Sequence, residues 1–191
     1  MKIIFATKNE GKVKEVKKIF DGDDIELISL NEFDNIADID ENGSTFEENA
    51  KIKALEIYQL FKLPVIADDS GLSVEQLNGA PGVISARYAG ENSNAAVNNK
   101  KLLDELNKFE EPHRAKFICA AVYYDGNNFF NTIGKMHGRI IKEARGVNGF
   151  GYDPLFIPEG YLLTNGELDL EEKNKISHRA KAFYALRKKI I

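Results

Sequence analysis

The spacing of hydrophobic and polar positions changes from strand-like to helix-like at the start of the chain. A short apolar run over residues 2–6 predicts a buried strand, and polar residues from Thr7 end it. Apolar residues then recur at helical spacing, and a second apolar run over residues 25–30 predicts another strand. The order strand, loop, helix, strand is typical of an α/β fold. The helical spacing is set by Val13, Val16, Ile19 and Phe20.

A polar, acidic segment over residues 31–43 predicts a loop, and a long helix follows it. The first helical residues are set by two overlapping capping boxes, in which a hydroxyl and a glutamate three positions later satisfy each other's backbone amides. Ser44 with Glu47 and Thr45 with Glu48 both fit this pattern, so the helix is expected to begin at either residue.

The second half of the chain continues the alternation of strands and helices. Two short strands are expected on either side of Asp68 to Gly71, because Asp-Ser-Gly is a turn sequence. No repeat or linker interrupts the pattern, which predicts a single α/β domain over residues 1–191 with a mixed sheet and flanking helices. The other expected elements are a glycine-rich loop (78–92), a helix (94–106), a hairpin (115–124 and 129–133) with its turn at 125–128, strands at 136–141 and 155–157, and a last helix capped by Ser177.

Composition narrows the class of protein and of partner. A chain of 191 residues with 43% hydrophobic and 29% charged residues is typical of a folded globular protein. With a net charge of −4, the protein lacks the positive electrostatic field that binding to nucleic acid or to an anionic membrane surface requires. We therefore expect no nucleic-acid or membrane partner, and a small polyanion held by a few local cations.

Cysteine usage and the N-terminus point to a cytoplasmic protein. The single cysteine, Cys119, lies in an apolar run and is expected to be a small buried hydrophobe. One cysteine cannot form an internal disulfide, and no zinc-binding spacing is present. The apolar N-terminal run is too short for a signal peptide or a membrane span.

The segment from Thr7 to Lys12 is the first candidate for chemistry. It is expected between a buried strand and a helix, where free backbone amides and the helix dipole favour a phosphate. Gly11 allows a close approach, and Lys8 and Lys12 supply positive charge. The segment is not a Walker A loop. A polar turn with exposed lysines explains the same residues, so this motif alone does not decide between a phosphate-binding site and an ordinary turn.

Asp68 and Asp69 form the second candidate. A turn needs one aspartate, and a second beside a buried strand adds repulsion unless a cation compensates it. Mg²⁺ suits such a site, because it takes oxygen ligands from one or two carboxylates together with phosphates and water. If the strand pleat continues through the pair, the two side chains face opposite sides, and only one faces a metal directly.

Three weaker candidates need support from other residues. Glu41 lies just ahead of the long helix and Lys53 two turns into it, and each alone is typical of a solvent-exposed residue. Residues 146–154 contain more glycines and aromatics than a turn requires, and an exposed aromatic can stack on a base. Lys173 and the Ser177-His178-Arg179 run could cap a helix or present donors to a nucleotide.

Together, in this order, the segments resemble the inosine triphosphate pyrophosphatase family, the non-canonical purine nucleoside triphosphate pyrophosphatases. The resemblance covers the chain from residue 3 to about 187, and the combination of motifs is far more specific than any one of them. The matching motifs are Thr7-x-Asn9-x-Gly11-Lys12, Glu41-x-Gly43-x-Thr45-Phe46-x-x-Asn49-Ala50, Ala67-Asp68-Asp69-Ser70-Gly71-Leu72, Gly79-Ala80-Pro81-Gly82-Val83-x-Ser85-Ala86-Arg87-Tyr88, Gly149-Phe150-Gly151-Tyr152-Asp153-Pro154 and Glu172-Lys173-x-x-Ile176-Ser177-His178-Arg179.

The resemblance implies an enzyme that hydrolyses inosine, deoxyinosine and xanthosine triphosphates to the monophosphate and pyrophosphate. It also implies a two-lobed α/β fold around a long mixed sheet with the active site in the cleft between the lobes, one or more Mg²⁺ ions per subunit, and a homodimer.

The resemblance also assigns roles to individual residues. The metal ligands would be Glu41 and Asp69, with Asp68 beside them, and Asp69 would accept a proton. Lys53 would assist at the phosphates. The phosphates would be held by Thr7, Lys8, Asn9, Glu10, Gly11 and Lys12, and Ser70 would contact the substrate. The base pocket would be formed by Phe150, Gly151, Tyr152, Asp153, Lys173, His178 and Arg179.

Two other functions fit parts of the pattern. A nucleotide phosphatase would release orthophosphate, although aspartyl-phosphate enzymes usually carry Asp-x-Asp near the N-terminus instead of adjacent aspartates. A non-catalytic sensor of purine nucleotides would use the same pocket without turnover. Arg179 and the backbone near Phe150 are candidate donors for the 6-oxo group of the base, but the sequence does not show how guanine is rejected.

Overall fold

The computed structural model describes residues 1–191, and its fold is α/β as expected. The strands form one sheet in the order β2-β1-β3-β4-β5-β6. The sheet is mixed, because β1 is parallel to β2 and β3 whereas β5 and β6 are antiparallel. The strands are β1 (Lys2–Phe5), β2 (Glu26–Ser29), β3 (Val65–Val74), β4 (His113–Tyr124), β5 (Phe129–Ile140) and β6 (Phe156–Pro158), and the α-helices are α1 (Glu10–Ile19), α2 (Phe46–Phe61), α3 (Ala95–Leu106), α4 (Leu170–Ile176) and α5 (His178–Ile190).

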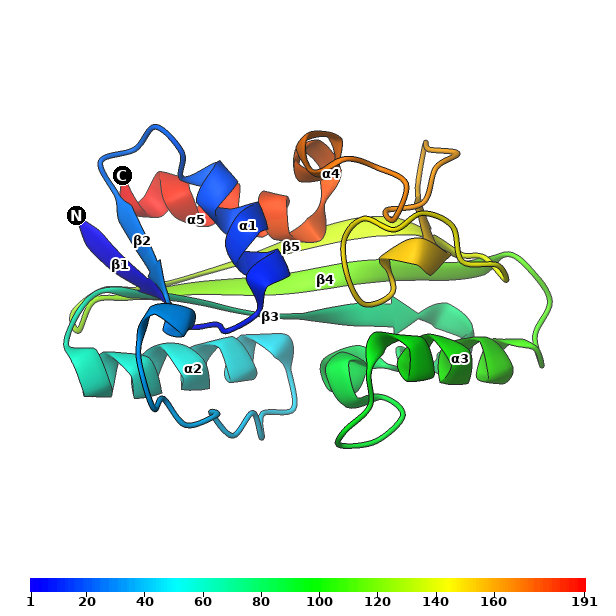
Figure 1. The fold of residues 1–191 in the computed structure, drawn as a ribbon, viewed down its shortest axis with the longest axis horizontal. Helices are drawn as coiled ribbons and strands as arrows, with labels where there is room; N and C mark the ends of the chain where they lie inside the picture. Colours follow the sequence, from blue (N-terminus) through cyan, green and yellow to red (C-terminus); the bar gives the residue numbers. More distant parts are fainter. The chain divides into compact units, whose positions relative to one another are not determined.

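The chain folds into two compact units. Unit 1 comprises residues 1–69, 119–134 and 179–191, and unit 2 comprises residues 70–118 and 135–178. In unit 1, helices α1 and α5 cover one face of the sheet and α2 covers the other (Figure 1). Its core contains Ile3, Phe5, Val16, Ile66 and Phe183, all with fully buried side chains.

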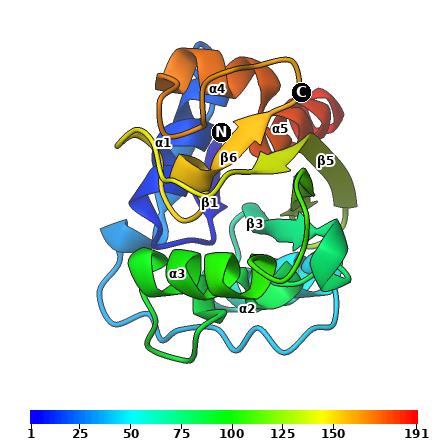
Figure 2. The same ribbon diagram turned by 90° about the vertical axis from the view of Figure 1, so that its right-hand side faces the viewer.

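Unit 2 has its own core and its own pair of helices. Helix α3 lies on one side of the strands and α4 on the other (Figure 2). Leu72 of β3, Leu102 of α3, Ile140 of β5 and Phe156 of β6 meet in this core. The two cores are separate hydrophobic clusters, so each unit buries apolar surface of its own.

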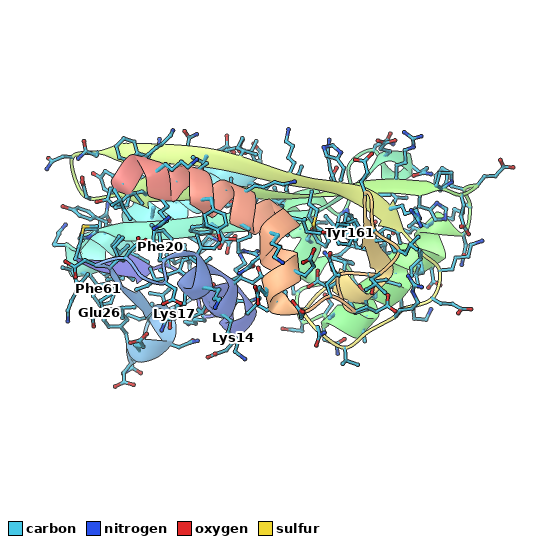
Figure 3. The ribbon with its side chains drawn as sticks, turned by 90° about the horizontal axis from the view of Figure 1, so that it is seen from above. Lys14, Lys17, Phe20, Glu26, Phe61 and Tyr161 are labelled. Atoms are coloured by element: carbon cyan, nitrogen blue, oxygen red, sulfur yellow. The ribbon has the colours of Figure 1, made fainter.

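The helix starts follow local capping. Thr45 accepts a bond from the Glu48 amide, and the Glu48 carboxylate accepts from the Thr45 amide, so the second of the two predicted capping boxes is formed. Helix α1 is capped by Asn9, which accepts from the Lys12 amide. Its apolar stripe is buried, whereas Lys14 and Lys17 lie on its exposed side (Figure 3).

Two predicted boundaries were wrong, and one helix was not predicted. The turn expected at Asp68 to Gly71 is absent, because β3 runs unbroken from Val65 to Val74. The strands expected at 129–133 and 136–141 are one strand, β5. The helix α4 was not predicted, and Ser177 lies between it and α5. Its apolar stripe is too short to stand out in a segment of seven residues.

The hairpin turn and the buried cysteine are as expected. The strands β4 and β5 are joined at residues 125–128, and Cys119 is fully buried in β4. None of the helices has the length and apolar composition needed to cross a membrane. The prediction of a single domain with the active site between two lobes stays a prediction.

Candidate active site

Asp68 and Asp69 are neighbours in β3, and their carboxylates have different partners within unit 1. Asp68 contacts residues of α1 and α5, whereas Asp69 contacts α2. These helices cover opposite faces of the sheet (Figure 1). The alternation expected of a pleated strand therefore separates the two side chains.

Asp68 lies in a buried cluster of alternating charges. Its Oδ2 atom lies 3.1 Å from Lys12 Nζ and 3.2 Å from Arg179 Nε. Arg179 also pairs with Glu15 at 2.6 Å, and both side chains are buried. Burial alone would raise the pKa of Asp68, but Lys12 and Arg179 lower it well below its ordinary value, so the carboxylate stays ionised.

Asp69 is held from α2. Asn49 Nδ2 donates to Asp69 Oδ2 at 2.9 Å, and Asn49 Oδ1 accepts from the Gly43 amide at 2.7 Å. Glu41, two residues before Gly43, pairs with Lys53 Nζ at 3.1 Å. Burial raises the pKa of Asp69, with Glu41 adding to the rise, although Lys53 and Lys12 act in the opposite direction.

The donor set fits Mg²⁺. Glu41 and Asp69 are carboxylates within electrostatic range of each other. In residues 1–191 there is no group of three or more His, Cys, Asp or Glu side chains that could hold a metal ion. Mg²⁺ needs only one or two carboxylates when substrate phosphates and water supply the other oxygens. The role of Asp68 as a ligand stays a prediction; its Oδ1 is buried without a hydrogen-bond partner.

The segment from Thr7 to Lys12 joins β1 to α1, as expected. Thr7 Oγ1 accepts from the Asn9 amide, and Asn9 caps the helix. Glu10 accepts from Asn31 at 2.9 Å, and Gly11 is half-buried in the first turn of α1. The segment therefore presents the N-terminus of a ten-residue helix, the arrangement that favours an anion.

The two lysines of this segment have different surroundings. Lys12 is directed to Asp68 in the buried cluster. Lys8 is exposed, and its Nζ bonds the Ile36 carbonyl at 2.8 Å and Asp38 at 2.7 Å. Lys8 therefore links the segment before α1 to the acidic loop that precedes α2.

In unit 2, the glycine-rich loop closes on Asp153. The Asp153 Oδ2 atom accepts from the Phe150 amide at 2.8 Å and from Lys173 Nζ at 2.7 Å. Its Oδ1 atom accepts from Asn165 at 3.1 Å. Asp153 is buried, so these contacts shape the loop. Gly149 is required here, since a Cβ would lie 2.1 Å from Asp153 Oδ2 and φ is +74°.

The other predicted base contacts in the loop have partners within unit 2. Lys173 Nζ lies 5.2 Å from the centroid of the Phe150 ring, a cation–π contact. Tyr152 is buried, and its hydroxyl donates to the Ser85 carbonyl at 2.8 Å. The Gly151 carbonyl accepts from Asn99.

The two basic residues of the Ser177-His178-Arg179 run have different partners. His178 is stacked on Phe117 of β4, with ring centroids 4.8 Å apart. Arg179 belongs to the cluster with Asp68 and Glu15 in unit 1. Ser70, the residue after Asp69, is half-buried. The substrate contacts proposed for these residues stay predictions.

Several residues of the site were missed. Glu15 looked like one more charged position on an amphipathic helix, although it falls on the buried side of the stripe set by Val16 and Ile19. Asn165 and Thr164 are fully buried, and no motif pointed to them. Thr164 Oγ1 donates to the Arg145 carbonyl, so this segment supports the glycine-rich loop.

Known proteins resemble the chain over nearly its whole length. The model of the Ham1 family matches residues 3–189. A protein named dITP/XTP pyrophosphatase from Nautilia profundicola is 50% identical over 186 residues, 95% of this chain and 93% of that protein. One of the same name from Oceanobacillus iheyensis is 48% identical over 190 residues, 98% of this chain and 96% of that protein.

A solved structure has the same fold. The structure of a HAM1 protein from Coxiella burnetii superposes with a TM-score of 0.90 at 39% identity, covering 100% of this chain and 98% of that chain. The resemblance indicated by the sequence motifs is therefore confirmed. The chain belongs to the Ham1 family.

Proposed function

We propose that the protein hydrolyses non-canonical purine nucleoside triphosphates, among them those of inosine, deoxyinosine and xanthosine, to the monophosphate and pyrophosphate. The observation that carries the proposal is the group formed in unit 1 by Asp69, Glu41 and Lys53. Two carboxylates and a buried cation fit a metal-bound triphosphate. The relatives named dITP/XTP pyrophosphatase support the choice of substrate.

The cations of unit 1 would receive the triphosphate. Lys12 and Lys53 are nearly buried, so solvent screens their charge less than it does that of the exposed Lys8. Their positive charge would reduce the repulsion that the phosphate oxygens exert on an attacking water. A bound Mg²⁺ would neutralise further charge on these oxygens. Glu41 and Asp69 would hold that ion.

Asp69 would accept the proton of the attacking water. Asn49 fixes its Oδ2 atom, so the direction of the carboxylate is set before the substrate arrives. The new bond would form between the water oxygen and the α-phosphorus, and the bond to the bridging oxygen would break. Pyrophosphate would leave with the electron pair of that bond.

The glycine-rich loop of unit 2 would bind the base. Phe150 offers an aromatic surface for stacking, and Lys173 lies over its ring. Backbone or side-chain donors aimed at a 6-oxo group would be left unpaired by the 6-amino group of adenine, which discriminates strongly. Guanine shares the 6-oxo group, so its rejection must come from the 2-position.

The proposal extends to a homodimer, as the family resemblance implies, and to a cytoplasmic location. Light scattering coupled to size-exclusion chromatography tests the dimer directly. A mass near 21.4 kDa would identify a monomer and contradict this part of the proposal.

The decisive experiment is a panel of inosine, xanthosine, guanosine and adenosine triphosphates with and without Mg²⁺, assayed for both pyrophosphate and orthophosphate. We expect Mg²⁺-dependent pyrophosphate release, fastest for inosine and xanthosine. Asp69→Asn should abolish turnover and still bind the triphosphate. The matched control is Asp21→Asn, which changes an exposed aspartate of the same unit.

The same assay separates the alternatives. Orthophosphate without pyrophosphate would identify a phosphatase. Binding of inosine triphosphate with Mg²⁺ but no turnover by the unmutated protein would identify a sensor. Equal rates of pyrophosphate release from the four nucleotides would support the proposed reaction and contradict the proposed selectivity for non-canonical bases.

A further inference from the structure

Ser85 fastens the segment from Gly79 to Tyr88 to strand β3. Its Oγ accepts from the Leu72 amide at 2.9 Å and donates to the Gly82 carbonyl at 2.6 Å. The Leu72 amide thus bonds to a side chain where a strand would ordinarily bond to another strand. Ser85 is buried, so these bonds are shielded from competing water.

The same residue also holds the glycine-rich loop. The buried hydroxyl of Tyr152 donates to the Ser85 carbonyl at 2.8 Å. Tyr152 lies in the loop between Phe150 and Asp153. This loop is closed by the bond from the Phe150 amide to Asp153 Oδ2. One residue therefore bonds β3 through its side chain and the loop through its backbone.

Ser85 connects two segments with different proposed roles, the strand that carries Asp69 and the loop that carries Phe150. Strand β3 contains Asp69 and Ser70 directly before Leu72, and the loop contains Phe150. A displacement of the loop would move the Ser85 carbonyl, and the Ser85 side chain would pass the movement to the Leu72 amide. Buried, well-packed groups transmit such shifts because no void absorbs them.

We propose that Ser85 is a positioning residue that couples recognition of the base by the glycine-rich loop to the alignment of the strand that carries Asp69. The inference rests on the proposed function, since it requires a purine triphosphate as substrate. Ser85 itself touches neither the base nor the phosphates in this proposal. It acts through Tyr152 on one side and Leu72 on the other.

The test uses two variants that break the connection at different ends. Tyr152→Phe removes the bond to the loop and keeps the aromatic ring. Ser85→Ala removes the bond to Leu72 and keeps the carbonyl that Tyr152 uses. Each should lower the ratio of kcat/KM for inosine triphosphate over adenosine triphosphate by roughly fivefold, the effect of one buried hydrogen bond. Tyr152→Phe should act mainly on KM, and Ser85→Ala mainly on kcat.

The matched control is Tyr88→Phe. The Tyr88 hydroxyl donates to Glu105 at 2.5 Å, so this variant also loses one tyrosine hydrogen bond in unit 2. It keeps all three bonds made by Ser85 and should leave the selectivity ratio unchanged. Thermal unfolding of every variant shows whether a fall in activity reflects a fall in stability.

A double-mutant cycle decides whether the two ends are coupled. In the proposal, the change in selectivity of the double variant is clearly smaller than the sum of the single changes, because either variant alone interrupts the connection. Additive effects would overturn the inference, and so would loss of stability with an unchanged selectivity ratio. Absence of pyrophosphate release by the unmutated protein would instead reject the proposed function, so the two failures are distinguishable.

Discussion

Asn49 donates a hydrogen bond of 2.9 Å from Nδ2 to Oδ2 of Asp69, and both side chains are buried in unit 1. The other end of the Asn49 amide accepts from the Gly43 backbone. Asn49 therefore links the proposed metal ligand in β3 to the loop that carries Glu41. The bond to Asp69 also leaves the carboxylate in one orientation.

Asn49→Ala should raise the Mg²⁺ concentration needed for half-maximal activity about tenfold. The reason is that residues which orient metal ligands typically contribute 10–100-fold to affinity. Stability should fall by about 1–3 kcal/mol, because the Gly43 amide loses its partner. A Mg²⁺ titration of activity and urea unfolding measure the two effects.

The control is Asn98→Ala in unit 2. Asn98 is likewise buried and makes bonds through both ends of its amide, to Ala89 and Ala86, neither of which is a proposed metal ligand. It should lose similar stability with an unchanged Mg²⁺ requirement. An equal shift in both variants would show that the Asn49 effect is general destabilisation.

Asp68→Asn should destabilise the protein more than Asp69→Asn does. Asp68 compensates the buried charges of Lys12 and Arg179, and removing one partner of a buried ion cluster costs about 3 kcal/mol or more. Burial already disfavours the ionised form of Asp69, so its neutralisation should cost less stability than that of Asp68. Urea unfolding in metal-free buffer compares the two variants. The reverse order would refute the separation of roles between the two carboxylates.

Features fixed by residues close in sequence were predictable. The Thr45 capping box and the Asn9 cap involve residues within one helical turn, so their chemistry can be read from the sequence. The sequence motifs were enough to identify the family, because their order and spacing are specific. The pleat of β3 separates the two aspartates as the alternation of a strand requires.

Features that depend on distant residues could not be predicted. Glu15 and Arg179 are 164 positions apart and pair only because α1 and α5 pack on the same face of the sheet (Figure 1). The turn expected at Asp68 to Gly71 was wrong because local turn propensity was overridden. Strand β3 lies between β1 and β4 in the sheet and continues through these residues, and the amide of Leu72 bonds Ser85.

Gly149→Ala should weaken nucleotide binding and stability more than Gly151→Ala. Both glycines have positive φ, +74° and +62°, so each alanine pays about 1–2 kcal/mol of backbone strain. Only at Gly149 would the new Cβ meet Asp153, 2.1 Å from Oδ2, whereas nothing lies within 4 Å at Gly151. Displacing Asp153 would break its bonds to Phe150 and Lys173.

The measurement for this pair is KM for inosine triphosphate together with the free energy of unfolding. Gly149→Ala should raise KM at least fivefold beyond Gly151→Ala, since one or two further hydrogen bonds are lost. Identical values for the two variants would show that Asp153 does not shape the loop.

Asp125 should contribute stability that is lost in acid. Its carboxylate accepts from the side chain and backbone of Asn128 and from the Asn127 amide in the β4–β5 turn. The bonds from Asn128 lower the pKa of Asp125 from its ordinary value of 3.8 to about 2. A carboxyl whose pKa is lowered on folding stabilises the protein above pH 4 and loses that contribution as pH falls from 4 to 2.

Because the turn is partly exposed, we expect this contribution to be at most about 1 kcal/mol. Urea unfolding at pH 3 and pH 6 should show a smaller difference for Asp125→Asn than for the unmutated protein, whereas equal differences would rule out this carboxylate as a source of acid sensitivity.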